Sequence, residues 1–395
     1  YRFTELSVLR NPCNPCPDFD TCMGCALLPM RYDEQLRWKH NLVKREFSLF
    51  SSLSSAEILE PLFPSRILGY RTTAKLAIAG SYYEPYIGIY RRSSHDVVDL
   101  DGCKIHHPAV NSIVNLVRRG INKLRIPVWQ VENGTGILRY LVVRVSEKSG
   151  EAMVTFVTAK RAFNEIHHLA KFLQNSMPQV KVICQNLNNS EGNVIFGASD
   201  RFLTKQRTIR DEIGVVQFEI SPRSFLQAKN DGANLIYEKV AEWSALDGKQ
   251  TVLDLYCGIG GIAITLARQG ARVFGVEINR DAVDDARRNA RINNLKECRF
   301  EAGDVSDILE ELIADGVNFD IITLNPPRKG CESGIISKLA ALRPGKIIYV
   351  SCSPETLARD LDRLSGYGYI CRSVQPVDMF PQTPHIENIA LLQLA

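Results

Sequence analysis

The stretch TVLDLYCGIGGIAITLARQG (residues 251–270) decides the fold, because it joins an apolar strand to an apolar helix through a glycine-rich turn. The same rhythm of strand, loop and helix continues in the segments at 271–294, 318–330 and 345–364. Strands that alternate with helices form a parallel sheet with helices on both faces. The sequence therefore predicts an α/β, doubly wound fold whose ligands bind beyond the carboxyl ends of the strands.

The rest of the chain divides into two further regions. Residues 1–64 combine a cysteine- and proline-rich head with a helix expected over residues 31–50. Residues 65–215 alternate like antiparallel strands, with a helix expected over residues 108–124, and predict an α+β middle domain. The doubly wound domain is expected over residues 216–395. Two or three domains agree with a length of 395 residues, which is long for a single core.

Composition excludes several classes of protein. Hydrophobic residues make up 45% and charged residues 23%, as in an ordinary globular protein, and no apolar run approaches the roughly 18 residues of a membrane span. The net charge of +4 permits a nucleic-acid partner without demanding one. Eleven cysteines without an export signal favour free thiols and metal ligation over disulfides, so we expect a cytoplasmic protein with no membrane partner.

The glycine-rich loop has the features of a nucleoside-binding site. Glu277 follows Gly258 by about the 20 residues expected of an acid that binds ribose hydroxyls. The loop also satisfies the dinucleotide pattern, so it fits both NAD and S-adenosylmethionine. Asp254 favours the second, because its carboxylate attracts a methionine ammonium and repels a pyrophosphate. Asp304 is a further candidate for contact with the cofactor.

An Asn-Pro-Pro step follows the strand expected at residues 319–324. Two prolines restrict the backbone and remove donors after Asn325, so the Asn amide and the neighbouring carbonyls are left to face a ligand. An aromatic residue after the prolines would indicate an amino-group methyltransferase, but Arg328 stands there. A plain turn is the alternative interpretation.

Cys352 ends the apolar strand KIIYVS, where a thiol needs an explanation. Uracil C5 is a poor nucleophile until a thiolate adds to C6 and generates an enolate that attacks a sulfonium methyl. A Ser-Pro turn and a helix follow Cys352, and a helix N-terminus would lower the pKa of this thiol. The alternative is an inert core thiol.

This chemistry also needs a base that removes the C5 proton. Glu387 is an acid isolated among apolar residues near the end of the chain, where desolvation would raise its pKa. An exposed turn carboxylate is the alternative.

The head carries cysteines at a spacing typical of metal sites. Cys16, Cys22 and Cys25 follow the pattern C-x5-C-x2-C, and Cys103 offers a distant fourth thiol. Four thiolates hold either a zinc ion or a four-iron cluster. Cys13 could replace Cys16 as a ligand.

Together, these residues show that the chain resembles the RNA uracil-C5 methyltransferases, most closely the iron-sulfur, RlmC-like branch that acts on 23S rRNA. The likeness spans nearly the whole chain. It rests on the cysteine head with Cys103 and on the motifs FLQ (225–227), DLYCGIGG (254–261), VEIN (276–279), NPPRKG (325–330), YVSCSP (349–354) and DMFPQTPHIENIALL (378–392).

The resemblance implies a role for each candidate residue. Cys352 would be the nucleophile and Glu387 the base that takes the C5 proton. A [4Fe-4S] cluster would be ligated by Cys16, Cys22, Cys25 and Cys103. S-adenosylmethionine would be contacted by Gln227, Tyr256, Glu277 and Asn325. The relatives often have Asn two residues after the Gln, where this chain has Lys229, whereas Asn325 matches the rRNA branch.

RNA contacts are expected from the middle domain. Many members of the family begin with a small β-barrel RNA-binding domain, and the segment ahead of Cys13 is too short to form one. Phosphate contacts and base stacking are expected from Arg66, Tyr70, Arg71, Lys75, Tyr90, Arg91 and Arg92. Each of these residues could instead belong to a solvated, charged strand edge.

The leading hypothesis is an enzyme that flips a uridine out of folded RNA, expected to be 23S rRNA, and methylates its C5 through a covalent adduct with Cys352. The same chemistry on the T-loop of tRNA is one alternative. Methylation of cytosine C5 or of an amino group in nucleic acid is another. An RNA-binding or redox-sensing iron-sulfur protein without methyl transfer is the alternative from a different class.

Overall fold

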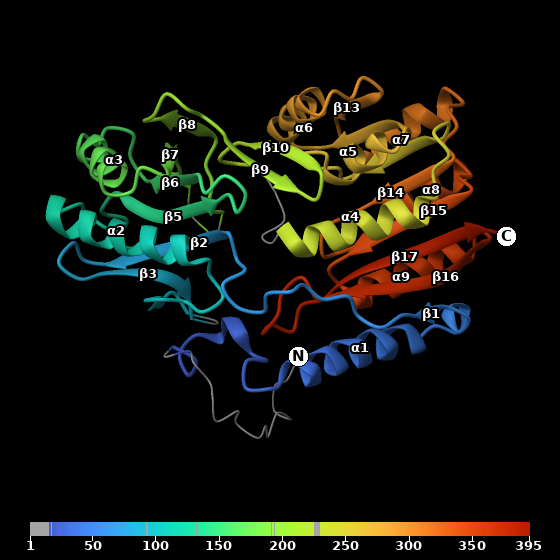
Figure 1. Cartoon of the computed structure of the whole chain (residues 1–395), viewed down its shortest axis with the longest axis horizontal. Helices are drawn as coiled ribbons and strands as arrows, with labels where there is room; N and C mark the ends of the chain where they lie inside the picture. Colours follow the sequence, from blue (N-terminus) through green and yellow to red (C-terminus); the bar gives the residue numbers. More distant parts are fainter. Residues whose placement is uncertain are drawn as a thin grey trace.

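The computed structural model describes residues 16, 18–91, 94–131, 133–190, 192, 194–224 and 230–395. The predictions that concern Cys13, Arg92, Gln227 and Lys229 lie outside these described residues. Figure 1 shows two sheets beside each other, one formed by the blue-green to green strands and one formed mainly by the yellow to red strands.

An eight-stranded sheet contains the strands of the doubly wound pattern. Its order is β1 (Glu57–Ile58), β16 (Tyr369–Val377), β17 (Glu387–Leu394), β15 (Lys346–Ser351), β14 (Ile321–Leu324), β11 (Thr251–Leu255), β12 (Arg272–Glu277) and β13 (Cys298–Ala302). The neighbours from β15 to β13 are parallel, as predicted, whereas β17 runs antiparallel between β15 and β16. The order of the strands reverses between β11 and β14, so a ligand crevice is expected at the carboxyl ends of these two strands.

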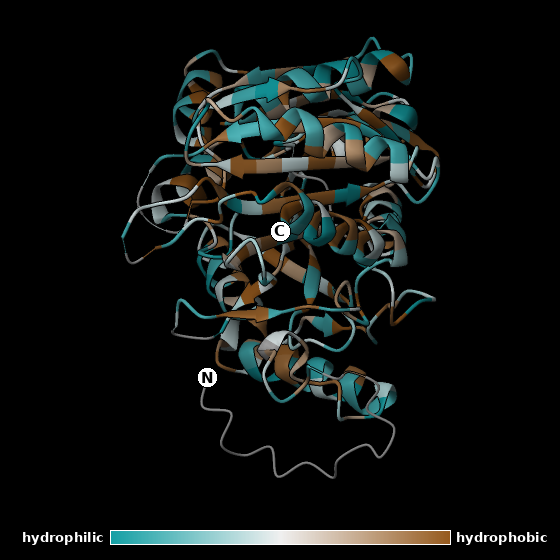
Figure 2. Cartoon of the chain, turned by 90° about the vertical axis from the view of Figure 1, so that its left-hand side faces the viewer, coloured by the Kyte–Doolittle hydropathy of each residue, from teal (hydrophilic) through white to brown (hydrophobic). Residues whose placement is uncertain are grey.

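Helices cover both faces of this sheet. They are α4 (Asn230–Ser244), α5 (Gly261–Arg268), α6 (Arg280–Ile292), α7 (Val305–Ala314), α8 (Ser333–Ala341) and α9 (Pro354–Ser365). One core cluster contains apolar residues of α4, α5 and α6, and a second contains those of α7, α8 and α9. Figure 2 shows helices that alternate hydrophilic and hydrophobic stretches, which is the pattern of helices with one face buried.

The second sheet has seven strands, in the order β4 (Val97–Asp99), β3 (Pro85–Tyr90), β2 (Thr73–Gly80), β5 (Leu138–Val145), β6 (Ala152–Thr158), β7 (Val180–Leu187) and β8 (Ser199–Phe202). Two helices, α2 (Pro108–Leu124) and α3 (Glu165–Ser176), pack into one core with it. The prediction of antiparallel strands fails for β6 and β7, which are parallel because α3 connects them as a crossover.

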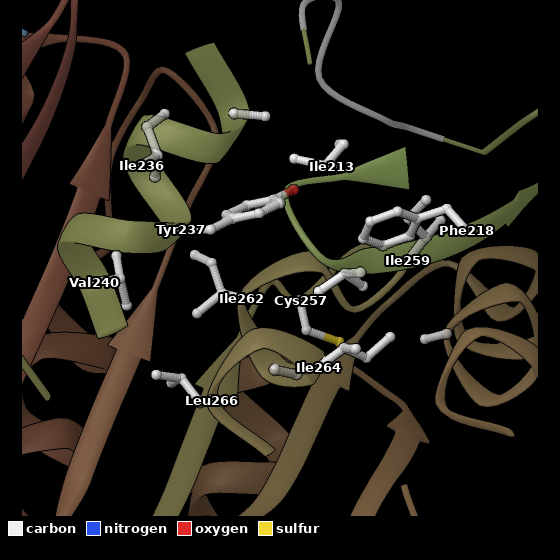
Figure 3. Close-up of a cluster of buried hydrophobic side chains, with 14 of the residues drawn as sticks. Ile213, Phe218, Ile236, Tyr237, Val240, Cys257, Ile259, Ile262, Ile264 and Leu266 are labelled. Atoms are coloured by element: carbon white, nitrogen blue, oxygen red, sulfur yellow. The ribbon is translucent and has the colours of Figure 1, made fainter. Parts of the chain in front are cut away.

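A hairpin links the two sheets along the chain. It consists of β9 (Ile209–Ile213) and β10 (Val216–Ile220), and the boundary predicted between residues 215 and 216 falls at its turn. Apolar side chains of both strands are buried in the same core as α4, α5 and α6. In Figure 3, Ile213 and Phe218 of the hairpin lie beside Tyr237 of α4 and Ile259 of the glycine loop.

The N-terminal region lies against both sheets. It contains the 3-10 helices η2 (Met23–Cys25) and η3 (Ser51–Leu53) on either side of α1 (Tyr32–Ser48), which agrees with the helix expected over residues 31–50. Helix α1 buries Val43 and Phe47 in the core that also contains α9, while β1 pairs with β16 (Figure 1).

Within the described residues, no helix is both long and apolar enough to cross a membrane.

Candidate active site

A cavity of about 770 Å³ opens at the carboxyl ends of the central parallel strands. Eight of the residues predicted to bind the cofactor or to act in catalysis line this one cavity, and they come from β11, β12, β17 and the loops that follow β11, β13, β14 and β15. They are Asp254, Tyr256, Gly258, Glu277, Asp304, Asn325, Cys352 and Glu387. The sequence placed these residues at strand ends, and parallel strands bring such ends together at one edge of the sheet.

The glycine loop between β11 and α5 adopts an unusual backbone. Tyr256 has φ of 58°, Gly258 of 56° and Gly260 of 88°, all in the left-handed region. For Tyr256, a residue with a side chain, this conformation is strained, and such strain concentrates at functional sites. A Cβ at Gly261 would lie only 2.1 Å from the hydroxyl of Tyr237, so the loop packs tightly under α4 (Figure 3).

Asp254 connects the elements on either side of the point where strand order reverses. Its Oδ2 accepts a hydrogen bond from the Ala263 amide at 3.1 Å and its Oδ1 accepts one from the Thr323 hydroxyl at 2.6 Å. Burial raises the pKa of Asp254 to about 7, and the two hydrogen bonds oppose that shift. The carboxylate therefore holds β11, α5 and β14 together, and its contact with a cofactor ammonium stays a prediction.

The two other acids of the cofactor set also have partners within the chain. Glu277 accepts hydrogen bonds from the amides of Gly258 at 3.1 Å and Asn279 at 3.0 Å. Asp304 caps α7 by accepting one from the Ser306 amide at 2.8 Å. Glu277 thus shapes the glycine loop directly, and both carboxylates face the cavity.

Cys352 and Glu387 meet although 35 positions separate them in the sequence. The antiparallel register pairs Ser351 of β15 with Asn388 of β17, so the residues that flank this pair, Cys352 and Glu387, lie side by side at the cavity. Glu387 is only 6% exposed, and burial raises its pKa to about 7, in the direction that the sequence predicted.

The prediction of a lowered pKa for Cys352 was wrong. Burial, followed by the nearby negative charge of Glu387, raises the pKa of this half-buried thiol. The helix α9 begins only at Pro354, and the hydroxyl oxygen of its N-cap, Ser353, accepts a hydrogen bond from the Thr356 amide. Desolvation therefore outweighs the effect of the helix N-terminus at this position.

Arg328 also lines the cavity, and the sequence alone assigned it no role in catalysis. Its positive charge, and after it a hydrogen bond to the thiol, opposes the rise in the pKa of Cys352. The same positive charge opposes the rise in the pKa of Glu387 and helps to lower the pKa of His385, another residue of the cavity. The sequence does contain a signal for this residue, namely a cation directly after Asn-Pro-Pro at a strand end. At the level of sequence, Arg328 was used only to note that no aromatic residue stands there.

The four cysteines predicted to bind a metal or cluster lie around one small pocket, and their role as ligands stays a prediction. Cys16, Cys22, Cys25 and Cys103 line one small pocket of about 20 Å³. Burial raises the pKa of Cys25 to about 12 and also raises the pKa values of Cys22 and Cys103, with the neighbouring thiols adding to each shift. In the described part of the chain, no group of three or more His, Cys, Asp or Glu side chains is arranged to hold a metal ion. Among the described residues, the structure therefore shows a small pocket lined by four thiols, without an arrangement that holds a metal ion.

The predicted RNA-binding residues do not form one surface. Lys75, Tyr90 and Arg91 line a groove of about 610 Å³ on the seven-stranded sheet, together with His95 and Tyr140. Arg66 instead forms an ion pair with Glu147. The expectation that Tyr70 stacks on a base was wrong, because Tyr70 is completely buried and donates its hydroxyl to the carbonyl of Pro381 at 2.9 Å.

Known sequences similar to this chain are RNA methyltransferases. The model of the family described as tRNA (Uracil-5-)-methyltransferase matches residues 31–394. The chain is 52% identical over 377 residues to an uncharacterized RNA methyltransferase of Geobacter sulfurreducens. The aligned region covers 95% of this chain and 76% of that protein. It is 37% identical over 380 residues to an uncharacterized RNA methyltransferase of Halalkalibacterium halodurans, covering 96% of this chain and 83% of that protein.

A solved structure shares the whole architecture. The tRNA (uracil-54, C5)-methyltransferase of Pyrococcus abyssi, in complex with S-adenosyl-L-homocysteine, superposes with a TM-score of 0.78 at 31% sequence identity. The match covers 94% of this chain and 86% of that one.

Proposed function

Because the chain belongs to the tRNA (uracil-5-)-methyltransferase family, and is thus an S-adenosylmethionine-dependent RNA (uracil-C5-)-methyltransferase, we propose that its substrate is a uridine of 23S rRNA and that Cys352 forms the covalent adduct. One observation carries the assignment of roles. Cys352, Arg328 and Glu387 line the same cavity as the glycine loop, so a nucleophile, a cation and a base stand beside the cofactor site.

The first step is the addition of the Cys352 sulfur to C6 of the flipped uracil. The pKa of the thiol is raised by burial and by Glu387, so the thiolate needs support, and the Arg328 hydrogen bond supplies it. Addition moves the electrons of the C5–C6 double bond toward C5 and O4, which makes C5 nucleophilic. S-adenosylmethionine, when bound, supplies the electrophilic methyl group.

The last step releases the product. Glu387 takes the proton from C5, the C5–C6 double bond forms again, and the C6–S bond breaks with its electron pair returning to Cys352. A base with a pKa of about 7 is substantially ionised at neutral pH and still basic enough to accept this proton. Removing Glu387 should therefore trap the methylated adduct.

The residues of the cavity fit S-adenosylmethionine. The cavity volume of about 770 Å³ suits a ligand of this size. The carboxylates that line the cavity suit the ammonium group and the two ribose hydroxyls of this cofactor. We assign cofactor contacts to Asp254, Tyr256, Gly258, Glu277, Asp304 and Asn325, and also to Gln227, which lies outside the described residues.

The groove on the seven-stranded sheet is the proposed RNA contact. Lys75 stands 5.6 Å from the ring centroid of Phe196, and Arg91 lines the groove together with Tyr90 and Tyr140. Cations interleaved with aromatic rings suit phosphates and unstacked bases. The T-loop of tRNA is the second candidate substrate, because the structurally similar Pyrococcus abyssi protein is named as a tRNA methyltransferase.

A four-iron cluster is the proposed occupant of the thiol pocket. Four cysteine thiolates would be the ligands of such a cluster. The donor set fits, since Cys16, Cys22, Cys25 and Cys103 line one pocket. The raised pKa values of Cys22, Cys25 and Cys103 mean that cluster binding must displace protons. Iron and sulfide analysis of anaerobically purified protein tests this assignment.

The substrate is tested by incubating the protein with labelled S-adenosylmethionine and unmodified 23S rRNA or tRNA transcripts, followed by digestion and mass spectrometry. We expect 5-methyluridine in the rRNA alone. 5-Methyluridine in tRNA alone would preserve the chemistry and overturn the substrate. 5-Methylcytidine or an N-methyl base would overturn the roles of Cys352 and Glu387.

A further inference from the structure

The segment that leads to Glu387 is held by residues far away in the sequence. We call residues 378–386, which connect β16 to β17, the strap. Phe380 and His385 of the strap line the active-site cavity, and Glu387 follows it directly. The position of the strap therefore sets where the proposed base stands.

A pair of glutamines fixes the middle of the strap. The Gln35 side chain of α1 accepts a hydrogen bond from the Gln382 amide at 2.9 Å and donates one to Gln382 Oε1 at 2.8 Å. Gln35 is 1% exposed and Gln382 is 4% exposed. Because both side chains are buried, breaking one contact leaves polar groups without water to replace it.

A buried ion pair fixes the start of the strap. Lys39 Nζ lies 2.6 Å from Asp378 Oδ1, and both side chains are completely buried. Lys39 Nζ also donates to the carbonyl of Phe380 at 3.1 Å, and the Tyr32 hydroxyl donates to Asp378 Oδ2 at 2.9 Å. A buried ion pair adds little net stability compared with apolar packing, so its use here points to a demand for exact position.

The cysteine head contacts the same segment. The amide of Leu27, two residues after Cys25, donates to the carbonyl of Gln382 at 3.0 Å. Tyr70 donates to the carbonyl of Pro381, and Gln382 Nε2 donates to the carbonyl of Ile67 at 3.3 Å. Three successive strap residues thus have their main chain held from outside, and Gln382 lies in the strap between the cavity residues Phe380 and His385.

We propose that Gln35 and Lys39 of α1, with Leu27 of the cysteine head, are positioning residues that hold the strap so that Glu387 reaches the C5 proton. The inference rests on the proposed function, in which Glu387 is the base. It gives the cysteine head a task in the reaction, because an ordered head is one of the supports of the strap.

The test compares two substitutions in α1. Gln35→Met removes both hydrogen bonds to Gln382 at nearly constant volume, whereas Val43→Ala removes packing in the core near α9 and no hydrogen bond to the strap. We expect Gln35→Met to lower kcat roughly 10- to 100-fold, because a small misplacement of a catalytic group has an effect of this size. Covalent RNA adduct should accumulate on gels, since release needs the base and methyl transfer does not. Val43→Ala should lower Tm without either change.

The outcomes separate the inference from its premise. If Gln35→Met lowers Tm while kcat and adduct stay as in Val43→Ala, the residue is only structural and the inference is overturned. If Glu387→Gln itself accumulates no adduct, the proposed base is wrong instead. Should Gln35→Met fail to fold, Tyr70→Phe removes a single hydroxyl bond to the strap and should accumulate adduct to a smaller extent, and normal release by this variant would overturn the inference.

A second experiment measures the order of the strap directly and does not depend on enzyme activity. Hydrogen exchange of the peptide that contains residues 378–386 is followed in anaerobically purified protein before and after iron is removed with a chelator. If the head supports the strap, exchange in this peptide should accelerate several-fold while peptides of β13 stay unchanged. Unchanged exchange in the strap would remove the head from the inference.

Discussion

The active-site cavity and the thiol pocket are both built from residues far apart in the sequence, yet they have opposite character. The cavity is wide, about 770 Å³, and contains Glu387, whose pKa burial raises to about 7. The thiol pocket is small, about 20 Å³, and burial raises the pKa of its Cys25 to about 12. A group with a pKa near neutrality can exchange protons during turnover, whereas a thiol with so high a pKa stays protonated unless a metal displaces the proton. The first region suits a reaction and the second suits a permanent ligand.

The largest effect is expected from removal of the Cys352 thiol in the active-site cavity. Cys352→Ala should reduce methyl transfer by at least about 10³-fold, because removing a nucleophile abolishes the covalent route. Radiolabel transfer to RNA measures it. Cys371→Ala is the matched control, since that thiol is buried in β16 away from the cavity and its loss should affect stability only. Activity retained in Cys352→Ala would contradict the proposed mechanism.

The second-largest effect on the rate is expected from replacement of the proposed base, Glu387. Glu387→Gln should lower kcat about 10²- to 10⁴-fold, the usual contribution of a general base, and the methylated adduct should accumulate. Denaturing gels of enzyme and labelled RNA detect the adduct. A slow enzyme without adduct would place the role of Glu387 before methyl transfer rather than after it.

Arg328 should have a smaller effect on rate and a distinct effect on the thiol. Arg328→Met removes the hydrogen bond and the positive charge that oppose the rise in the pKa of Cys352. The pH profile of Cys352 alkylation should shift to higher pH, and methyl transfer should fall roughly 10-fold or more. An unshifted profile would show that the guanidinium does not act on the thiol.

The raised pKa of Glu387 also predicts how stability depends on pH. Between about pH 4.5 and 7 the folded chain holds a proton that the unfolded chain has lost, so this contribution is present below about pH 4.5 and is lost as the pH rises through about 7. Relative to wild type, Glu387→Gln should gain up to about 3 kcal/mol of unfolding free energy between pH 4 and pH 8. Urea unfolding at both pH values measures the gain, and parallel pH dependence in the two proteins would contradict it.

The smallest effect on the thiol chemistry is expected from the thiol pocket. Cys103→Ser should lose the iron of the proposed cluster and lower Tm, while the alkylation rate of Cys352 stays within about twofold of wild type, because the residues that line the thiol pocket include none of β15 and the strap positions Glu387 rather than the thiol. Iron analysis and alkylation kinetics are the measurements. A large change would show that loss of the thiol pocket affects the Cys352 thiol itself and not only the strap.

Much of the fold and of the cavity could be predicted because the signals are local. Glycines at the turn after β11, apolar strands followed by amphipathic helices, and polar residues at strand ends are patterns of short range. They were enough to place Asp254, Gly258, Glu277, Asn325 and Cys352 at one edge of one sheet. The four cysteines were likewise predicted from spacing and residue type, which indicate a shared site without its geometry.

Only the tertiary structure decided the rest, because pairing and burial depend on residues remote in the sequence. The register of β15 with β17 brings Glu387 to Cys352, and desolvation there raises the pKa of a thiol that its helix alone would lower. The crossover through α3 makes β6 and β7 parallel, although their local pattern suits either direction. Burial turns Tyr70 from an expected RNA contact into a support of the strap, and no local pattern reports which surface another segment will cover.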